Sequence, residues 1–215
     1  MKFLDFRILR ELKKHGELSI NSLAKTLGKT YDTVRRHVHL MAENGFLKMK
    51  PKGRKIIISL SDGIAAKAAV FLAECIEFEK ALARADNELA ELASALISSL
   101  CENFPDTKID LYFYGSFVDE RKRKADLDVF VVSPPDKKEM IKKSLPSSKR
   151  LHALVVSNEE FSVMELKQEP TVIQAILAGI HLQLPIPAHR RLIFASAKKQ
   201  HSKHVFAFER NERTT

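Results

Sequence analysis

Four residues near the middle of the 215-residue chain have the types and the spacing needed to hold a metal ion and a phosphate. Asp126 and Asp128 stand two positions apart beside an apolar run, and side chains at this spacing on a β-strand project from one face. Neighbouring carboxylates repel each other unless a cation lies between them, and Mg²⁺ is usually held by one or two carboxylates together with substrate phosphates. Gly115 allows a backbone to approach a phosphate closely, and Ser116 offers a hydroxyl. The pattern predicts metal-dependent phosphate binding, and the alternative is a surface turn with two solvated acids.

Two apolar strands must position these residues. The first, residues 111–114, leads into Gly115-Ser116, and the second, residues 126–132, carries both aspartates. A helix that started near Ser116 would add free N–H groups for an anion.

A Gly-Ser turn after one strand, a nine-residue spacer and Asp-x-Asp on the next strand resemble the nucleotidyltransferase superfamily typified by DNA polymerase beta. The closest resemblance is to its small, minimal members, and it covers residues 105–185. It implies that Asp126 and Asp128 are catalytic residues that hold Mg²⁺ or Mn²⁺. It also implies that Gly115 and Ser116 bind a nucleoside triphosphate, with Ser116 part of the catalytic set.

The sequence departs from this family pattern at the third carboxylate. The family usually takes that acid from the next core strand, but residues 151–156 contain no acid, and His152 is their only polar residue. Two carboxylates can hold a metal-bound nucleotide, whereas activating an attacking hydroxyl with a second metal is harder without the third. Histidine suits softer metals than Mg²⁺, so Mn²⁺ is the better candidate to support activity.

The first sixty residues predict three helices and a hairpin. Apolar stripes with helical spacing are separated by Gly16 and Gly28, and Ser19 and Thr30 stand where helix N-caps are expected. Two strands then flank a turn with Gly53, which suits a residue with positive φ.

Residues 23–46, with a short helix, a glycine turn and a polar start to the third helix, resemble the winged helix-turn-helix family of prokaryotic regulators. The resemblance implies that the third helix enters the major groove of double-stranded DNA. The expected DNA-binding residues lie off the apolar stripe of that helix or at the tip of the wing: Tyr31, Asp32, Thr33, Arg35, Arg36, His39, Lys52, Arg54 and Lys55. The alternative is a winged helix used only for protein contacts.

The charge of the chain is uneven. Residues 1–62 carry a net charge of +8 and residues 63–104 a net charge of −4, out of +9 for the whole chain. A compact basic module indicates a polyanionic partner. The alternative is a solvated basic face.

Residues 63–104 are rich in Ala, Leu and Glu and predict two helices, about 63–84 and 87–103. They serve either as a linker that packs on the core or as a homodimer interface that would place two winged helices on a two-fold operator.

The fold class expected is α+β: an N-terminal winged helix-turn-helix, a helical linker, and a C-terminal nucleotidyltransferase-fold mixed sheet with flanking helices. The expected boundaries are 1–62 for the DNA-binding domain, 63–104 for the linker, 105–187 for the nucleotidyltransferase-like domain and 188–215 for a basic tail.

No window approaches the length of apolar sequence that a membrane helix needs, and the N-terminus shows no signal-peptide pattern. Cys75 and Cys101 lack partners at metal-ligand spacing. A cytoplasmic protein is therefore expected, without membrane contact.

Two interpretations remain open at this point. One is a DNA-binding transcriptional regulator fused to a domain that binds a metal–nucleoside triphosphate, with nucleotidyl transfer left open. The other is a non-enzymatic transcription factor whose degenerate nucleotidyltransferase-like domain is a ligand sensor or dimer scaffold.

Overall fold

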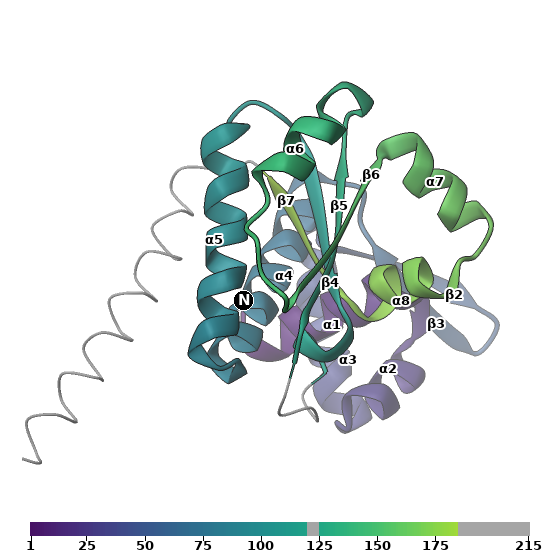
Figure 1. The fold of residues 1–215 in the computed structure, drawn as a ribbon. Coiled ribbons are helices and arrows are strands. Elements are labelled where there is room, and N and C mark those ends of the chain that lie inside the picture. Colours follow the sequence, from purple (N-terminus) through teal and green to yellow (C-terminus); the bar gives the residue numbers. More distant parts are fainter. Residues whose placement is uncertain (120–124, 185–215) are drawn as a thin grey trace, which may run out of the picture.

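The computed structural model describes residues 1–119 and 125–184 (Figure 1). It has the expected α+β fold: a small winged helix at the N-terminus and a mixed sheet with flanking helices after it. The predictions for residues 185–215, including the basic tail, concern a part of the chain outside the described residues. None of the described helices is both long and apolar enough to cross a bilayer.

The N-terminal part contains three helices and a three-stranded antiparallel sheet. Its elements are α1 (Phe3–His15), β1 (Glu17–Ser19), α2 (Ile20–Leu27), α3 (Tyr31–Glu43), β2 (Leu47–Lys52) and β3 (Lys55–Leu60), with sheet order β1-β3-β2. Ser19 and Thr30 cap α2 and α3 as predicted, since each side-chain oxygen accepts a backbone N–H three residues on. Gly28 ends α2 in the left-handed conformation.

Two long helices follow, and then a second sheet. These elements are α4 (Ile64–Arg84), α5 (Asn87–Asn103), β4 (Ile109–Tyr114), β5 (Leu127–Ser133), α6 (Lys138–Ser144), β6 (Leu151–Ser157), α7 (Asn158–Leu166), α8 (Pro170–Ala178) and β7 (Ile180–Leu184). The strand order is β6-β5-β4-β7, in which β5 and β6 are parallel and the other pairs are antiparallel. Pro170 occupies the first position of α8, where its missing N–H is not needed.

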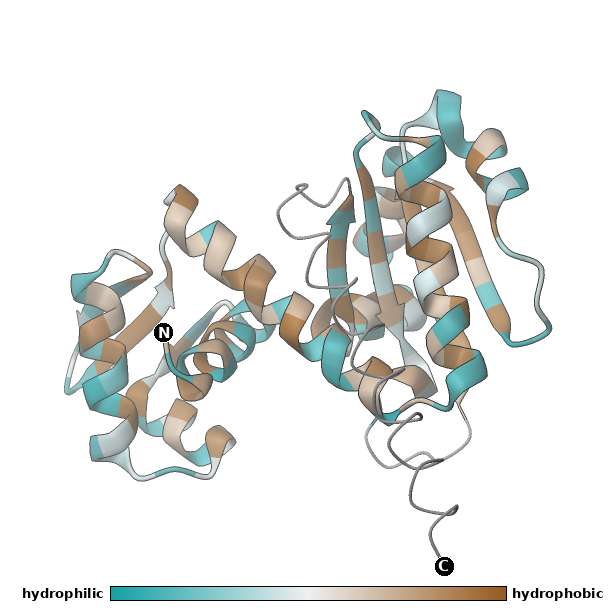
Figure 2. Cartoon of the chain, turned by 90° about the vertical axis from the view of Figure 1, so that its left-hand side faces the viewer, coloured by the Kyte–Doolittle hydropathy of each residue, from teal (hydrophilic) through white to brown (hydrophobic). Residues whose placement is uncertain are grey.

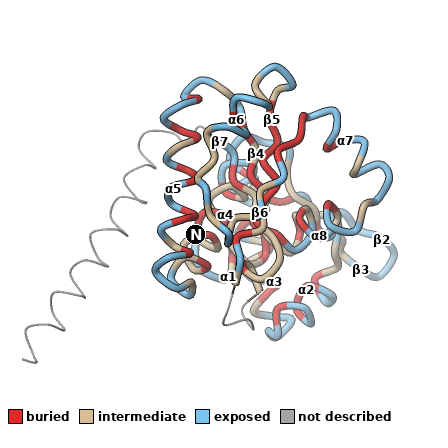
Figure 3. The backbone as a smooth tube through the Cα atoms, in the orientation of Figure 1, coloured by how far each residue is buried: buried red, intermediate tan, exposed pale blue. Residues whose placement is uncertain are grey.

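The second sheet is covered on both faces. Alternate residues of β4 and β5, such as Phe113 and Val129, pack with Phe78 of α4 and Leu96 of α5 in one core. On the other face, Phe130 packs against α7 and α8. In Figure 3, red buried segments run along the central strands β4 and β5.

Helix α4 belongs to both halves of the molecule. Ala69, near its start, is part of the winged-helix core, whereas Phe78, two turns later, is part of the sheet core. Figure 2 shows the two parts side by side with a long helix running from one into the other.

Glu74 lies between these two contacts, and its side chain is only 2% exposed. Its Oε1 accepts a hydrogen bond from Lys13 Nζ at 3.0 Å and lies 3.7 Å from Arg10 Nε, and both cations belong to α1. Its Oε2 accepts the backbone N–H of His181 on β7 at 2.9 Å. One carboxylate therefore connects three elements from the two parts of the chain.

The apolar residues that suggested a dimer interface in residues 63–104 are largely used inside the chain. Leu89, Leu96 and Leu100 of α5 are fully buried in the sheet core. A homodimer remains a prediction, and any interface on these helices would have to use their outer faces. Light scattering at micromolar concentration should report a particle of about twice 24.4 kDa. A monomer mass alone would contradict it.

Replacing Glu74 by Ala should lower the free energy of unfolding by about 3 kcal/mol, because it leaves Lys13 half-buried without its counter-charge and removes one of the two acids that hold Arg10. Urea unfolding followed by circular dichroism measures the change. Glu102→Ala removes the same group from an exposed position of α5 and should change stability by less than about 0.5 kcal/mol. Equal effects of the two substitutions would contradict the role of Glu74.

Candidate functional site

Gly115 ends β4, and its geometry leaves no room for a side chain. Its φ is +67°, a conformation that residues with a Cβ rarely adopt. A Cβ on Gly115 would also collide with the carboxylate of Asp128. The glycine turn and the acid therefore lie in direct contact. Residues Gly115–Phe117 form a three-residue 3-10 turn, not the start of an α-helix.

Ser116 links this turn to the beginning of β5. Its Oγ accepts the backbone N–H of Asp126 at 3.0 Å, and its hydroxyl donates to the carbonyl of Asp126 at 3.3 Å. Ser116 therefore holds the backbone of Asp126 in place. A phosphate at this turn would have to compete with that carbonyl for the hydroxyl proton.

The two aspartates differ in environment. Asp126 immediately precedes β5 and its side chain is 52% exposed, whereas Asp128 lies within β5 and is 24% exposed. In the sheet register Asp128 stands opposite Tyr114 of β4 and beside His152 of β6. Burial raises the pKa of the Tyr114 hydroxyl, and the charge of Asp128 raises it further, so Tyr114 remains a hydrogen-bond donor at neutral pH.

His152 occupies the sheet position where the third carboxylate is expected. Its Nδ1 lies 3.1 Å from Asp128 Oδ1, within hydrogen-bond distance. On β6, the strand beside Asp128, the residue in register with Asp128 is therefore a histidine.

A second cation, Arg150, lies near Asp126, with Nε 3.8 Å from Oδ1. Arg150 is fixed by two hydrogen bonds to Asp86 at the start of α5, at 2.9 and 2.8 Å, and by one to the carbonyl of Ala125 at 2.6 Å. The bonds to Asp86 raise the pKa of the guanidinium and lower that of the Asp86 carboxyl. Arg150 is thus a permanent positive charge beside the aspartates.

These donors fit one divalent cation that is shared with a ligand. The described residues contain no group of three His, Cys, Asp or Glu side chains placed to hold a metal ion by themselves. Mg²⁺ needs only one or two carboxylates when phosphates complete its shell, and Asp126 and Asp128 can supply these. A second metal ion lacks its carboxylate, because His152 stands in that place.

The predicted DNA-binding residues of α3 fall into two groups. Tyr31, Asp32, Arg35 and Arg36 are exposed along the helix. Thr33 and His39 are half-buried: the Thr33 hydroxyl lies 2.8 Å from that of Thr30, and His39 Nε2 is buried with no hydrogen-bond partner among the residues that the structure describes. The exposed group is better placed to reach DNA.

The wing is the β2–β3 hairpin, and its tip carries the three predicted cations Lys52, Arg54 and Lys55, all exposed. Gly53 has a φ of +61°, as the turn requires. Figure 1 shows this hairpin projecting from the body of the molecule.

Two buried acids were not foreseen from the sequence. Glu74 was described above, and Asp5 of α1 lies 2.5 Å from His37 Nδ1, which ties α1 to α3. Both acids stand in an apolar helical stripe, as Glu74 does between Phe71 and Phe78. The sequence signal for both buried acids was therefore an acid at a helix position where the apolar spacing predicts an inward-facing residue.

Comparison with protein families separates the two halves of the chain. Residues 93–199 match the family model of the nucleotidyltransferase domain. The chain joins a winged helix-turn-helix module to a nucleotidyltransferase-like domain. Residues 4–65, the winged-helix module, match a second family model that is described only as HVO_A0114. No curated protein matches the chain in sequence.

Solved structures align mainly with the winged-helix module. A probable transcriptional regulator from Pseudomonas aeruginosa is 20% identical over 46% of this chain and 78% of its own, with a TM-score of 0.36. A single-substitution mutant of MarR from E. coli is 14% identical to this chain, with a TM-score of 0.32. The alignment covers 35% of this chain and only 57% of the MarR chain. HmgR from Pseudomonas aeruginosa is 14% identical over 81% of this chain and 70% of its own, with a TM-score of 0.28. These scores are low, so the winged-helix description rests on the topology of the chain itself.

Gly115→Ala should destabilise the nucleotidyltransferase-like domain by about 2–4 kcal/mol, because it combines a strained φ with displacement of the Asp128 carboxylate. Gly53→Ala in the wing is the matched control, since its φ is similar and nothing lies within 4 Å of the added Cβ. That control should cost about 1 kcal/mol. Urea midpoints compare the two, and equal losses would show that contact with Asp128 adds nothing.

Proposed function

We propose that the chain is a DNA-binding transcriptional regulator whose nucleotidyltransferase-like domain binds a metal–nucleoside triphosphate as a ligand and transfers it poorly or not at all. The observation that supports nucleotide binding is the contact of Asp128 with Gly115, together with the place of His152 beside Asp128 on the neighbouring strand. This geometry supports holding a nucleotide through one shared cation and lacks the acid needed for a second one.

In the proposed complex Asp126 and Asp128 hold a Mg²⁺ or Mn²⁺ ion that also contacts the phosphates. The bound ion supplies positive charge between the carboxylates and the triphosphate. Arg150 places a guanidinium 3.8 Å from Asp126, and the His152 imidazole lies 3.1 Å from Asp128, so both groups stand where they could contact a polyanion held there. The turn at Gly115 and Ser116 lets the backbone approach the phosphates.

The DNA half rests on the exposed cations of the winged-helix module. Arg35 and Arg36 on α3 and the wing tip are exposed, and none of these cations forms an ion pair within the described part of the chain. Unpaired cations on one face of a small module attract the phosphate backbone, and α3 is the element that would enter the major groove.

Double replacement of Arg35 and Arg36 by Ala should weaken binding to duplex DNA by about 1–3 kcal/mol for each lost base contact. Fluorescence anisotropy with genomic fragments, repeated at several salt concentrations, measures both the affinity and its salt dependence. The matched control is Lys142→Ala with Lys143→Ala, which removes two exposed cations from α6. The DNA proposal fails if no fragment binds in a salt-dependent way, or if both double variants bind equally.

Asp126→Ala with Asp128→Ala should weaken binding of ATP, CTP or GTP at least tenfold in Mg²⁺ or Mn²⁺, because the shared cation loses its protein ligands. Isothermal titration measures this. Asp106→Ala with Asp136→Ala removes two exposed acids elsewhere and should leave the affinity unchanged. Equal binding by wild type and the site variant, or no binding by either, would overturn the nucleotide proposal.

His152→Asp restores an acid at the third position and should tighten Mg²⁺-dependent nucleotide binding relative to wild type. The same titration, run in Mg²⁺ and in Mn²⁺, provides the comparison. Incorporation of labelled nucleotide by the wild-type chain, lost on Asp128→Ala, would show instead that transfer is its native activity.

A further inference from the structure

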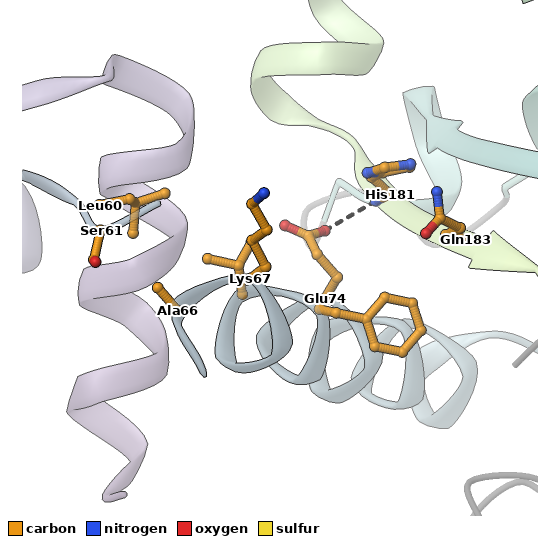
Figure 4. A pocket seen from close by; sticks show the side chains of 9 residues that line it. Leu60, Ser61, Ala66, Lys67, Glu74, His181 and Gln183 are labelled. Atoms are coloured by element: carbon orange, nitrogen blue, oxygen red, sulfur yellow. Dashed lines mark hydrogen bonds between the residues drawn. The ribbon is translucent and has the colours of Figure 1, made fainter. Parts of the chain in front are cut away.

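A cavity of about 260 Å³ lies where the winged helix meets the second sheet. Its walls come from the end of β3, from the first three turns of α4 and from the edge strand β7 (Figure 4). It is distinct from the Gly115–Asp128 site, because none of its lining residues belongs to that site.

The cavity combines an apolar lining with the ammonium group of Lys67. Leu60, Val70 and Phe71 provide the apolar surface, and Lys67 reaches into the space from α4. The Lys67 ammonium forms no ion pair or side-chain hydrogen bond within the described residues. The nearby charge of Glu74 is already balanced by Lys13 and Arg10 of α1. A positive charge is therefore available to a ligand.

Two polar side chains on β7 line the opposite side, and Asp110 orients both of them. Asp110 Oδ1 lies 2.8 Å from His181 Nε2 and accepts a hydrogen bond from Gln183 Nε2 at 3.1 Å. The His181 ring is further fixed by stacking on Tyr112, with the ring centroids 4.3 Å apart and the planes at 5°. Burial would raise the pKa of Asp110, but the hydrogen bond and charge of His181 bring it below its usual value, so Asp110 stays ionised at neutral pH. His181 Nδ1 and Gln183 Oε1 are left to contact a ligand.

We propose that this cavity binds a small anion with an apolar body, that is, a carboxylate or phosphate group carried on about one ring. Lys67 would hold the anionic group, the apolar wall would cover the body, and Gln183 Oε1 would accept a hydroxyl or amine of the ligand, with His181 Nδ1 also within the cavity wall. The volume corresponds to roughly nine liquid waters, which limits the ligand to a small molecule. It lies just below the usual range for drug-sized sites.

Such a ligand would contact both halves of the chain at once, since Leu60 and Ser61 belong to the wing side and His181 and Gln183 to the sheet. Where the DNA proposal above holds, the ligand is expected to change DNA affinity. Binding of the ligand itself does not depend on that proposal, so the two can fail separately.

The test is a titration of the full chain with benzoate and phenyl phosphate, in which binding is measured by ligand-observed NMR and by calorimetry. Benzyl alcohol supplies the ring without charge, and inorganic phosphate supplies charge without the ring. We expect one of the two aromatic anions to bind at least about tenfold more tightly than either control, and the preferred one distinguishes a carboxylate from a phosphate ligand. If neither aromatic anion exceeds both controls, the proposal is overturned.

Lys67→Gln should weaken the preferred anion about tenfold while leaving the thermal unfolding midpoint unchanged, because Lys67 is exposed and unpaired within the described residues. Lys142→Gln makes the same change on α6 and should bind as wild type does. Val70→Phe, which fills the cavity, should remove binding. Equal affinity of wild type and Lys67→Gln would show that the anion binds elsewhere.

Discussion

The carboxylate of Glu74 is the constraint on which the arrangement of the two halves depends. A charge that is 2% exposed is costly unless it is paired and hydrogen-bonded, and its partners come from α1 on one side and β7 on the other. Moving the winged helix away from the sheet would leave Glu74 without Lys13, and leave His181 without an acceptor for its backbone N–H. The contacts continue from α1 to α3 through Asp5 and His37. Two separate sets of polar contacts, both on α1, therefore lie between the edge of the sheet and the proposed recognition helix, and α1 connects them as a rigid element.

The nucleotidyltransferase-like site shows how the surroundings of two acids shape what they can do. The Gly115 turn and the Asp128 carboxylate fit together so closely that a Cβ at position 115 would displace the carboxylate. Around them, this chain places the His152 imidazole and the Arg150 guanidinium, so each acid has a nitrogen-bearing side chain beside it before any ligand arrives. A third acid would increase the repulsion among the carboxylates and would require a second cation to offset it. An imidazole and a guanidinium beside the two acids create no such requirement. The site is therefore better suited to holding a polyanion with one metal ion than to two-metal chemistry.

The elements that sequence reasoning predicted well depend on local signals. Caps at Ser19 and Thr30, and the strand that carries Asp128, involve residues only two or three positions apart, so their geometry follows from helix and strand periods; Asp126, predicted on the same strand, instead lies just before it. The assignment of α4 to two cores could not be read this way. Its decisive contacts join Glu74 to residues 61 and 107 positions away, and no short pattern encodes such a pairing. The dimer hypothesis has the same origin, because the apolar face of a helix has the same sequence pattern whether it packs on its own sheet or on a second chain.

The pairing of charges also explains which basic residues of the winged-helix module are left for DNA. Its net charge of +8 is not all available, since Arg10 and Lys13 are held by Glu74 and Glu77 of the acidic segment. These pairs lie on the side of the module that faces the sheet. The cations without an ion pair in the described structure include Arg35 and Arg36 of α3 and those of the wing tip. The acidic helix thus neutralises one side of a basic module and leaves the other side positive, and an uneven field of this kind orients the module on a polyanion as well as attracting it.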